Sequence, residues 1–207
     1  MPRIDAPKYI ETLLDICKKE QIQAVVTFID PEIEILSKHR AEFAAIGVEL
    51  LVPYEKTAHL CFDKFEMYKH LKSCGIPTVE TWGDLDSFSQ ALFIGTVGFP
   101  VFVKPRTGRG SVGAKKIYSM DELKTAMELD PSLIIQEFME CTDLDADVYI
   151  DTISHEAVCA FSKHKIETRI GGASKTVSFK DERLFAFIQR LVKEFKFNGP
   201  VDMDFFC

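Results

Sequence analysis

The chain has 207 residues, of which 46% are hydrophobic, and this length can bury one core or two small ones. Its formal net charge is −7, from 25 lysines and arginines against 32 aspartates and glutamates. This acidic balance argues against a general nucleic-acid or membrane-surface binder, because the affinity of such proteins depends on basic patches.

The first quarter of the chain alternates helix and strand patterns. Apolar residues recur with helical spacing in residues 8–20, and a short buried-type strand follows in residues 24–29. A second helix begins at Asp30 and ends at Gly47, before a strand in residues 48–52. Helix and strand in alternation with short connections predict part of a parallel α/β layer. Asp30 follows the carboxyl end of a strand, where such sheets commonly hold ligands, although a plain helix N-cap also explains it.

The rest of the chain carries further helix and strand patterns separated by Gly and Pro. Ser119 to Glu122 reads as a capping box, which predicts the start of a helix. The segment 163–175 is polar and basic. The predicted helices span residues 63–73, 87–94, 120–127 and 181–195. The predicted strands span residues 101–103, 115–118, 133–137, 148–153 and 157–162, with a last strand after Gly199.

A cationic glycine-rich loop joins two of these strands. It lies within residues 99–118, FPVFVKPRTGRGSVGAKKIY, and the apolar run before it ends at Lys104. Glycines allow positive φ and bring backbone N–H groups close to a ligand, and successive exposed N–H groups form an anion site. The loop glycines and the arginines beside them are Gly108, Gly110, Gly113, Arg106 and Arg109. This unit therefore suits a polyphosphate.

Other glycine-loop classes fit this stretch less well. Residues 108–113 spell G-x-G-x-x-G, but a dinucleotide fingerprint needs a helix directly after the loop, and here a strand follows. A P-loop needs Lys directly after its last Gly, where this chain has Ala114. The H-R-D and D-F-G motifs of a protein kinase are absent from the sequence. An ordinary glycine-rich surface hairpin stays open as an alternative.

Several charged residues lie on otherwise apolar strands. Lys104 follows three apolar residues, and a partly desolvated amine requires an anion. Asp202 and Asp204 lie on the last strand, where unpaired carboxylates are costly, so we expect a metal or a basic partner for at least one. Three more aspartates alternate along the chain and so share one side of a strand: Asp143, Asp145 and Asp147.

The cysteines and histidines give no metal or disulfide pattern. The six cysteines are scattered without a C-x-x-C pair, which is typical of buried or free thiols in a reducing compartment. The five histidines lack metal-ligand spacing. No apolar run is long enough to cross a bilayer, and the N-terminus lacks the form of a signal peptide. These features predict a soluble, cytoplasmic protein.

Five motifs occur in a characteristic order. They are Asp63-Lys64 followed by GIPTVET, FPVFVKP with its glycine loop, IIQEFMECTDLDADVYID, RIGGASKTVSF and GPVDMDFF. From about Tyr9 to its end the chain thereby resembles ATP-grasp proteins, close to the carbamoyl-phosphate-synthase-large-subunit-like branch. The resemblance implies an α/β protein in which two α+β subdomains sandwich ATP. The implied domains are a partial Rossmann-like layer (1–58), a small subdomain with the glycine-rich lid (59–138) and a large subdomain (139–207).

The resemblance also implies an ATP-binding role for particular residues. Lys64 and Lys104 resemble the two cations that hold the α- and β-phosphates, although Lys64 could equally be a solvated helix residue. The residues that resemble the lid over the triphosphate are Gly108, Arg109, Gly110, Ser111 and Gly113. The residues that resemble the hinge whose backbone meets the adenine edge, with Glu137 facing the amino group, are Gln136, Glu137, Phe138 and Met139.

Four further residues complete the implied site. Asp143 stands where the family has a carboxylate for the ribose hydroxyls, and Asp204 stands where a side chain ligates magnesium. Arg169 and Lys175 lie in the segment that faces the γ-phosphate and the acceptor, although a solvated face explains them as well. Magnesium prefers hard oxygen ligands, and phosphoryl transfer needs cations around the phosphate oxygens, which agrees with this set.

The implied function is that of a Mg-ATP-dependent carboxylate–amine ligase that works through an acyl phosphate. Its expected partners are a small-molecule carboxylate and an amine, with no nucleic acid or membrane, and a homodimer or a partner chain that completes the site. The sequence departs from the family pattern because a Glu-x-Asn pair after GPVDMDFF and the opening strand of the preceding domain are missing. The alternatives are therefore one half of a split ligase, or a non-catalytic nucleotide-binding or regulatory subunit.

Overall fold

The computed structural model describes residues 1–108, 112–169 and 172–206, which divide into two compact units. The first unit comprises residues 1–59, 145–162 and 179–203, and the second comprises residues 60–144, 163–178 and 204–207. Each unit is described by itself. The division into residues 1–58, 59–138 and 139–207 stays a prediction. Among the described residues, none of the helices combines the length and the apolar character needed to cross a bilayer.

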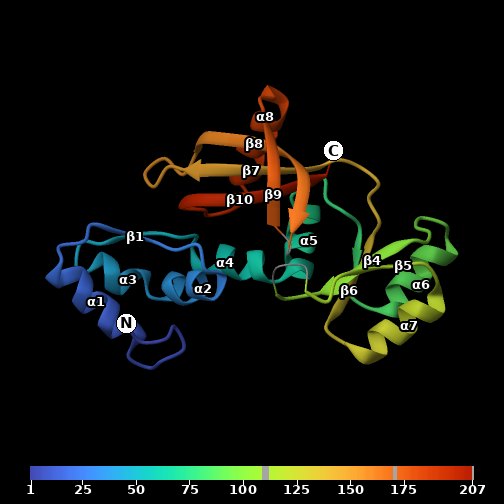
Figure 1. Cartoon of the computed structure of the whole chain (residues 1–207), viewed down its shortest axis with the longest axis horizontal. Helices are drawn as coiled ribbons and strands as arrows, with labels where there is room; N and C mark the ends of the chain where they lie inside the picture. The colour runs from blue at the N-terminus through green and yellow to red at the C-terminus, as the bar shows by residue number, and fades with distance from the viewer. Residues whose placement is uncertain (109–111, 170–171, 207) are drawn as a thin grey trace. The chain divides into compact units, whose positions relative to one another are not determined.

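The first unit begins with a small parallel layer. Strands β1 and β2 pair in parallel with Val25 opposite Leu50, as the alternating pattern predicted. The helices cover this pair through a core that includes Leu36 and Phe43, both 0% exposed. The elements in chain order are α1 (Tyr9–Lys19), β1 (Ala24–Val26), α2 (Asp30–Lys38), α3 (Arg40–Ala44) and β2 (Glu49–Leu51) (Figure 1).

Two expectations for this region were wrong. The single helix from Asp30 to Gly47 is two helices, because the backbone leaves the helical region at His39, with φ −100° and ψ 10°. A further helix, α4 (Glu55–Phe62), was not predicted. Its sequence has a weak apolar stripe, and contacts with a distant segment hold it: Lys196 N donates to Thr57 Oγ1 at 2.9 Å.

The second unit contains an antiparallel sheet in the order β3-β6-β4-β5. Figure 1 shows α6 and α7 on the same side of this sheet, and Phe88 of α6 and Leu123 of α7 pack against its buried residues. The strands are β3 (Thr81–Trp82), β4 (Val101–Pro105), β5 (Lys115–Ile117) and β6 (Leu133–Glu137). The helices are α5 (Lys64–Ser73), α6 (Leu85–Phe93) and α7 (Met120–Leu129).

The predicted start of α7 is confirmed by its cap. The Ser119 hydroxyl accepts from the Glu122 N–H at 3.3 Å, and the Glu122 carboxylate accepts from the Tyr118 N–H at 2.8 Å. One helical donor that lacks an intrahelical partner, the Glu122 N–H, is satisfied in this way, and the Glu122 side chain reaches back to the residue before the cap. The glycine loop therefore joins two antiparallel strands, β4 and β5, before the helix begins, as the sequence predicted.

A third sheet has the order β10-β7-β8-β9. Helix α8 buries Ile188 and Val192, and its Gln189 amide donates to the carbonyl of Ala157 at 2.9 Å. The basic segment 163–175, for which no strand was predicted, lies mostly in two strands. The elements are β7 (Asp143–Ile150), β8 (Ala157–Arg169), β9 (Gly172–Phe179), α8 (Glu182–Val192) and β10 (Gly199–Phe206).

Candidate functional site

Lys104 lies on the face of the β3-β6-β4-β5 sheet that points away from α6 and α7. Its neighbours Val101 and Val103 are both 0% exposed and pack against those helices, and strand side chains alternate between the two faces. Burial, and next to it the charge of Lys64, lower the pKa of Lys104 from 10.5 to about 8, and the charge of Asp204 opposes this shift. Two cations and a carboxylate thus lie close enough to influence one another.

Lys64 is the first residue of α5, and its position is fixed by a network around Asp63. The Asp63 carboxylate accepts from the N–H groups of Phe65 at 3.1 Å and Glu66 at 3.0 Å, which caps the helix. The same carboxylate accepts from Arg106 Nε, at 2.8 Å to each oxygen. The Lys64 N–H donates to the Arg106 carbonyl at 3.0 Å. The start of α5 is therefore tied to the residue that leads from β4 into the glycine loop.

The described part of the glycine loop contacts Lys64 and requires glycine at one bend. Lys64 Nζ donates to the Gly108 carbonyl at 2.8 Å. Gly113 has φ +76°, and a Cβ there would lie 3.1 Å from the Pro105 ring, so a side chain would be strained and crowded. The other predicted loop residues lie outside the described part of the chain: Arg109, Gly110 and Ser111.

Gln136 lies near the end of β6 and is oriented by a hydrogen-bond relay. Its Nε2 donates to Thr81 Oγ1 at 2.8 Å, and Thr81 Oγ1 donates its own proton to the Val79 carbonyl at 2.9 Å. Because a hydroxyl has one proton, Thr81 acts as the acceptor for Gln136. The relay fixes the amide orientation, and the Gln136 amide oxygen is the group that can accept a hydrogen bond from a ligand.

The carboxylate and the backbone N–H of Glu137 both make hydrogen bonds within the fold. Its carboxylate accepts from the Glu80 N–H at 2.9 Å, and its own N–H donates to the Glu80 carbonyl at 3.0 Å. This contact occupies the side chain, and the expectation that Glu137 faces an amino group within a hinge that acts through its backbone stays a prediction. Glu137 pairs with Val101, whose side chain points into the core, and so lies on the opposite face of the strand from Gln136. The backbone role of residues 136–139 stays a prediction.

One face of the sheet gathers cationic, aromatic and amide side chains. Phe102 is paired with Lys116 on one side and with Gln136 on the other, so the three lie side by side. Lys116 Nζ lies 3.5 Å from the centre of the Phe138 ring, which is a close cation–π contact. This face, which also carries Lys104, offers an aromatic surface beside hydrogen-bonding groups and positive charge.

Asp143 and Asp204 share one buried lysine that the sequence did not single out. Lys165 Nζ lies 3.3 Å from Asp143 Oδ1 and also donates to Asp204 Oδ1. The side chain of Lys165 is 10% exposed, whereas those of Asp143 and Asp204 are 42% and 70% exposed. Burial lowers the pKa of Lys165, but the two carboxylates raise it by more. The expectation of a metal or a basic partner for at least one of Asp202 and Asp204 is thereby confirmed.

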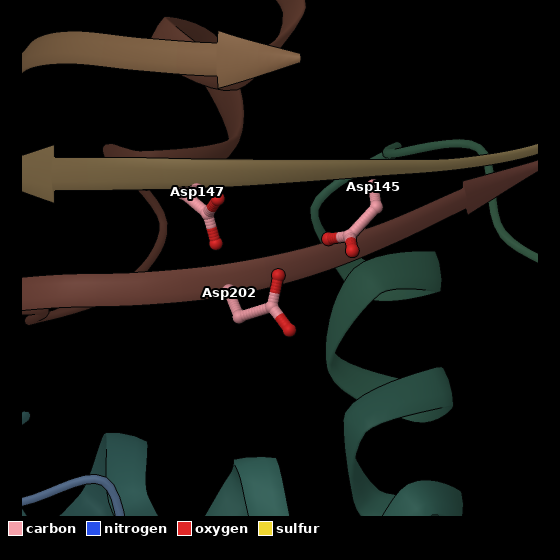
Figure 2. A group of neighbouring side chains, drawn as sticks. All are labelled: Asp145, Asp147 and Asp202. Carbon is pink, nitrogen blue, oxygen red and sulfur yellow. The ribbon is translucent and has the colours of Figure 1, made fainter. Parts of the chain in front are cut away.

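A second carboxylate group lies on the first unit. Asp145 and Asp147 project from one side of β7 toward Asp202 of β10, as Figure 2 shows. One oxygen from each lies within 4.8 Å of the others, a spacing that a metal ion could bridge. The three residues share a side as the alternation predicted for two of them, but the predicted metal ligand Asp204 is not a member of this group.

The two residues expected near the γ-phosphate are only partly described. Lys175 Nζ lies 2.6 Å from the Glu167 carboxylate, and its side chain is 70% exposed, as for a solvated ion pair. Arg169 is the last residue of β8, and its side chain is not among those that the structure describes. A surface hollow of about 610 Å³ lies elsewhere, between β5 and α7, and none of the predicted site residues lines it.

The residues present fit a nucleotide polyphosphate with magnesium. Lys64 and Lys104 supply positive charge, and Asp204 and Asp143 supply hard oxygen atoms. Asp204 is well exposed, so it can reach a ligand, but it is already neutralised by Lys165.

Two family models match consecutive parts of the chain. The model described as "PylC-like, N-terminal domain" matches residues 1–51, and that described as "D-ala D-ala ligase C-terminus" matches residues 71–169. Among curated relatives, a pyruvate carboxylase subunit of Methanothermobacter thermautotrophicus is 28% identical over 45% of this chain and 22% of that protein. D-alanine–D-alanine ligase B of Clostridium perfringens is 25% identical over 67% of this chain and 54% of that protein.

A third relative is the carbamoyl phosphate synthase large chain of Saccharolobus islandicus, 24% identical over 95% of this chain and 20% of that protein. The chain thus spans about half the length, or less, of these relatives.

Solved structures share the fold over nearly the whole chain. N5-carboxyaminoimidazole synthase from Aspergillus clavatus, in complex with ADP, has a TM-score of 0.70 at 16% identity and covers 99% of this chain and 53% of that one. The biotin carboxylase domain of Hydrogenobacter thermophilus 2-oxoglutarate carboxylase, a dimer with MgADP, has a TM-score of 0.69 at 18% identity. The match covers 99% of this chain and 49% of that one. The two α+β sheets and the helical layer before them thereby confirm the fold class inferred from the motifs.

Proposed function

We propose that this chain is an ATP-grasp protein that binds Mg-ATP and uses it to activate a small-molecule carboxylate for attack by an amine. The observation that carries the proposal is the convergence of Lys64, Lys104 and Asp204 within one unit. Burial and the repulsive charge of Lys64 lower the pKa of Lys104, so the charged form of Lys104 is unfavourable unless an anion binds beside it. A polyphosphate is the ligand that best relieves this repulsion.

The proposed roles follow from the chemistry of each group. Lys64 and Lys104 bind phosphate oxygens together with backbone N–H groups of the glycine loop. Asp143 accepts hydrogen bonds from the ribose hydroxyls, and the ring of Phe138 lies on the face that meets the base. The amide oxygen of Gln136 accepts a hydrogen bond from an exocyclic amino group.

Magnesium would be held by Asp204 and by the nucleotide's own phosphate oxygens, since Mg²⁺ usually takes one or two carboxylates plus phosphates. When bound, the ion neutralises charge on the transferring phosphoryl group. The residues of this chain then have to align the attacking carboxylate oxygen and the leaving oxygen of ADP with the γ-phosphorus, and they have to exclude water. A substrate carboxylate oxygen attacks the γ-phosphorus and ADP leaves, and an amine next attacks the acyl carbon and inorganic phosphate leaves. Arg169 and Lys175 are proposed to face the acceptor in these steps.

The branch within the superfamily is a finer proposal. The order of the five motifs supports a carbamoyl-phosphate-synthase-like protein, while the relatives named above include a D-alanine–D-alanine ligase and a pyruvate carboxylase subunit of similar identity. The acceptor acids to compare are therefore bicarbonate, an α-amino acid and other small carboxylates. Release of ADP that depends on one of these acids, with or without an amine, distinguishes the branches.

Nucleotide binding is tested by calorimetry on the chain as it exists. We expect saturable binding of MgATP by the wild type and loss of binding by at least tenfold in Lys104→Met, because one of two phosphate-binding charges is removed. Lys124→Met is the matched control, since Lys124 lies exposed on α7 and loses the same charge. Absence of saturable heat in the wild type, or equal losses in the two variants, would refute the proposal.

A further inference from the structure

Lys165 stands out because it is the most buried member of an ion triad. It contacts one carboxylate that is proposed for the ribose, on the neighbouring strand β7, and one that is proposed for the metal, on β10, the strand beyond β7 in the sheet order. With its side chain 10% exposed and both partners more exposed, the lysine is the fixed centre of the triad. Because this ammonium has little access to water, its charge is stabilised by its contacts with these two carboxylates.

The ammonium occupies the position from which a metal would reach Asp204. Lys165 Nζ contacts Asp204 Oδ1 and lies 3.3 Å from Asp143 Oδ1. A single ion at the position of Nζ would therefore be near both oxygens. A divalent cation bound to Asp204 at a normal metal–oxygen distance would lie close to this positive charge. Like charges a few ångströms apart repel strongly in a partly buried site.

The charge balance differs once phosphates are present. Lys165, Asp143 and Asp204 together carry a net charge of −1, which one divalent cation would convert to +1. A polyphosphate that binds the metal supplies the missing negative charge. The repulsion between Lys165 and the metal is therefore relieved only in the ternary complex.

We propose that Lys165 is a tethered cation that withholds Asp204 from free divalent metal, so that the metal binds only together with the nucleotide phosphates. The inference rests on the proposed function, because it takes Asp204 as the metal ligand. Lys165 is thus a positioning residue that sets the order of assembly. Metal bound alone would hold Asp204 in an unproductive state, and the lysine prevents this.

The test measures Mn²⁺ binding in the absence of nucleotide, by calorimetry or electron paramagnetic resonance, on the whole chain. Mn²⁺ is the probe because it accepts the same oxygen ligands as Mg²⁺. We expect weak binding by the wild type and binding at least tenfold tighter by Lys165→Gln and Lys165→Met, in which two carboxylates are left without their cation. Lys165→Arg keeps the charge and is expected to bind Mn²⁺ as weakly as the wild type. Lys124→Gln controls for net charge.

Unchanged Mn²⁺ affinity in both charge-removing variants would overturn the inference, and so would equally tight Mn²⁺ binding by the wild type with and without ATP. MgATP binding is measured beside it, because its absence in the wild type refutes the nucleotide function instead. A large loss of ATP affinity in Lys165→Gln under EDTA would also overturn the inference, since the lysine would then be a phosphate ligand. If neither variant folds by circular dichroism, Asp143→Asn leaves Lys165 to Asp204 alone, and Mn²⁺ binding tighter than that of the wild type would contradict the inference.

Discussion

The lowered pKa of Lys104 makes nucleotide affinity depend on pH in a calculable way. Burial and the neighbouring charge of Lys64 bring this pKa from 10.5 to about 8, a difference of about 3 kcal/mol between the protonation states. The amine is cationic below that pH and neutral above it. Because only the cation attracts phosphate, the ligand-free protein loses its binding form as the pH rises through about 8.

The size of the effect follows from the protonated fraction. That fraction is about 0.9 at pH 7 and about 0.1 at pH 9 for a group with a pKa of about 8. A bound phosphate holds the proton on Lys104, so we expect ATP affinity to fall about tenfold between these pH values. At pH 8 binding should take up about half a proton per nucleotide.

The assay is calorimetry in pairs of buffers with different ionisation enthalpies, which reports the protons taken up. Lys104→Arg is the matched variant, because a guanidinium stays charged throughout this range. Its affinity is expected to vary little from pH 7 to 9. A wild-type affinity that changes less than twofold over the same range, with no proton uptake at pH 8, would refute the reasoning.

Three further predictions concern stability, measured by urea unfolding. Gly199→Ala should destabilise by about 1–3 kcal/mol, because its φ is +85° and a Cβ would lie 2.8 Å from a side-chain carbon of β2; an unchanged midpoint would contradict this. Burial raises the pKa of Asp63, but the bond from Arg106 and the helix N–H groups lower it by more. Stability that Asp63 provides is therefore present above pH 3.8 and lost as the pH falls further, and Asp63→Asn should remove this acid dependence. Phe88→Ala should cost about 3–5 kcal/mol and Phe93→Ala, on the same helix but 92% exposed, less than about 0.5 kcal/mol; similar costs would show that the core is misassigned.

Local patterns predicted most elements of the fold, but not the features that depend on distant contacts. The strand–loop–strand unit around Lys104 and the cap of α7 were visible because they depend on neighbouring residues. The break at His39 was not, because the apolar stripe continues through it, and Leu36 and Phe43 are both fully buried. Helix α4 was missed because a segment far along the chain, at Lys196, stabilises it.

The candidate site likewise contains residues that local patterns singled out and residues whose role depends on distant contacts. Lys104 and Asp204 were found because each is a charged residue on an apolar strand. Lys165 was missed because it lies in a basic segment, and its partners are 22 and 39 residues away. The orientation of Glu137 was available from the sequence, since adjacent strand residues point to opposite faces. The alternation assigns the face that carries Lys104 to the side chain of Gln136, while the hinge role that the resemblance implies for the backbone around Glu137 stays a prediction.

The Asp63–Arg106 network has an energetic consequence for the amines near it. It holds Lys64 and the residues after Lys104 in place through backbone and side-chain bonds that need no ligand. The folded protein therefore keeps two mutually repelling ammonium groups near each other before any ligand binds. An arriving polyanion finds the cations already arranged, and the release of their repulsion adds to its affinity.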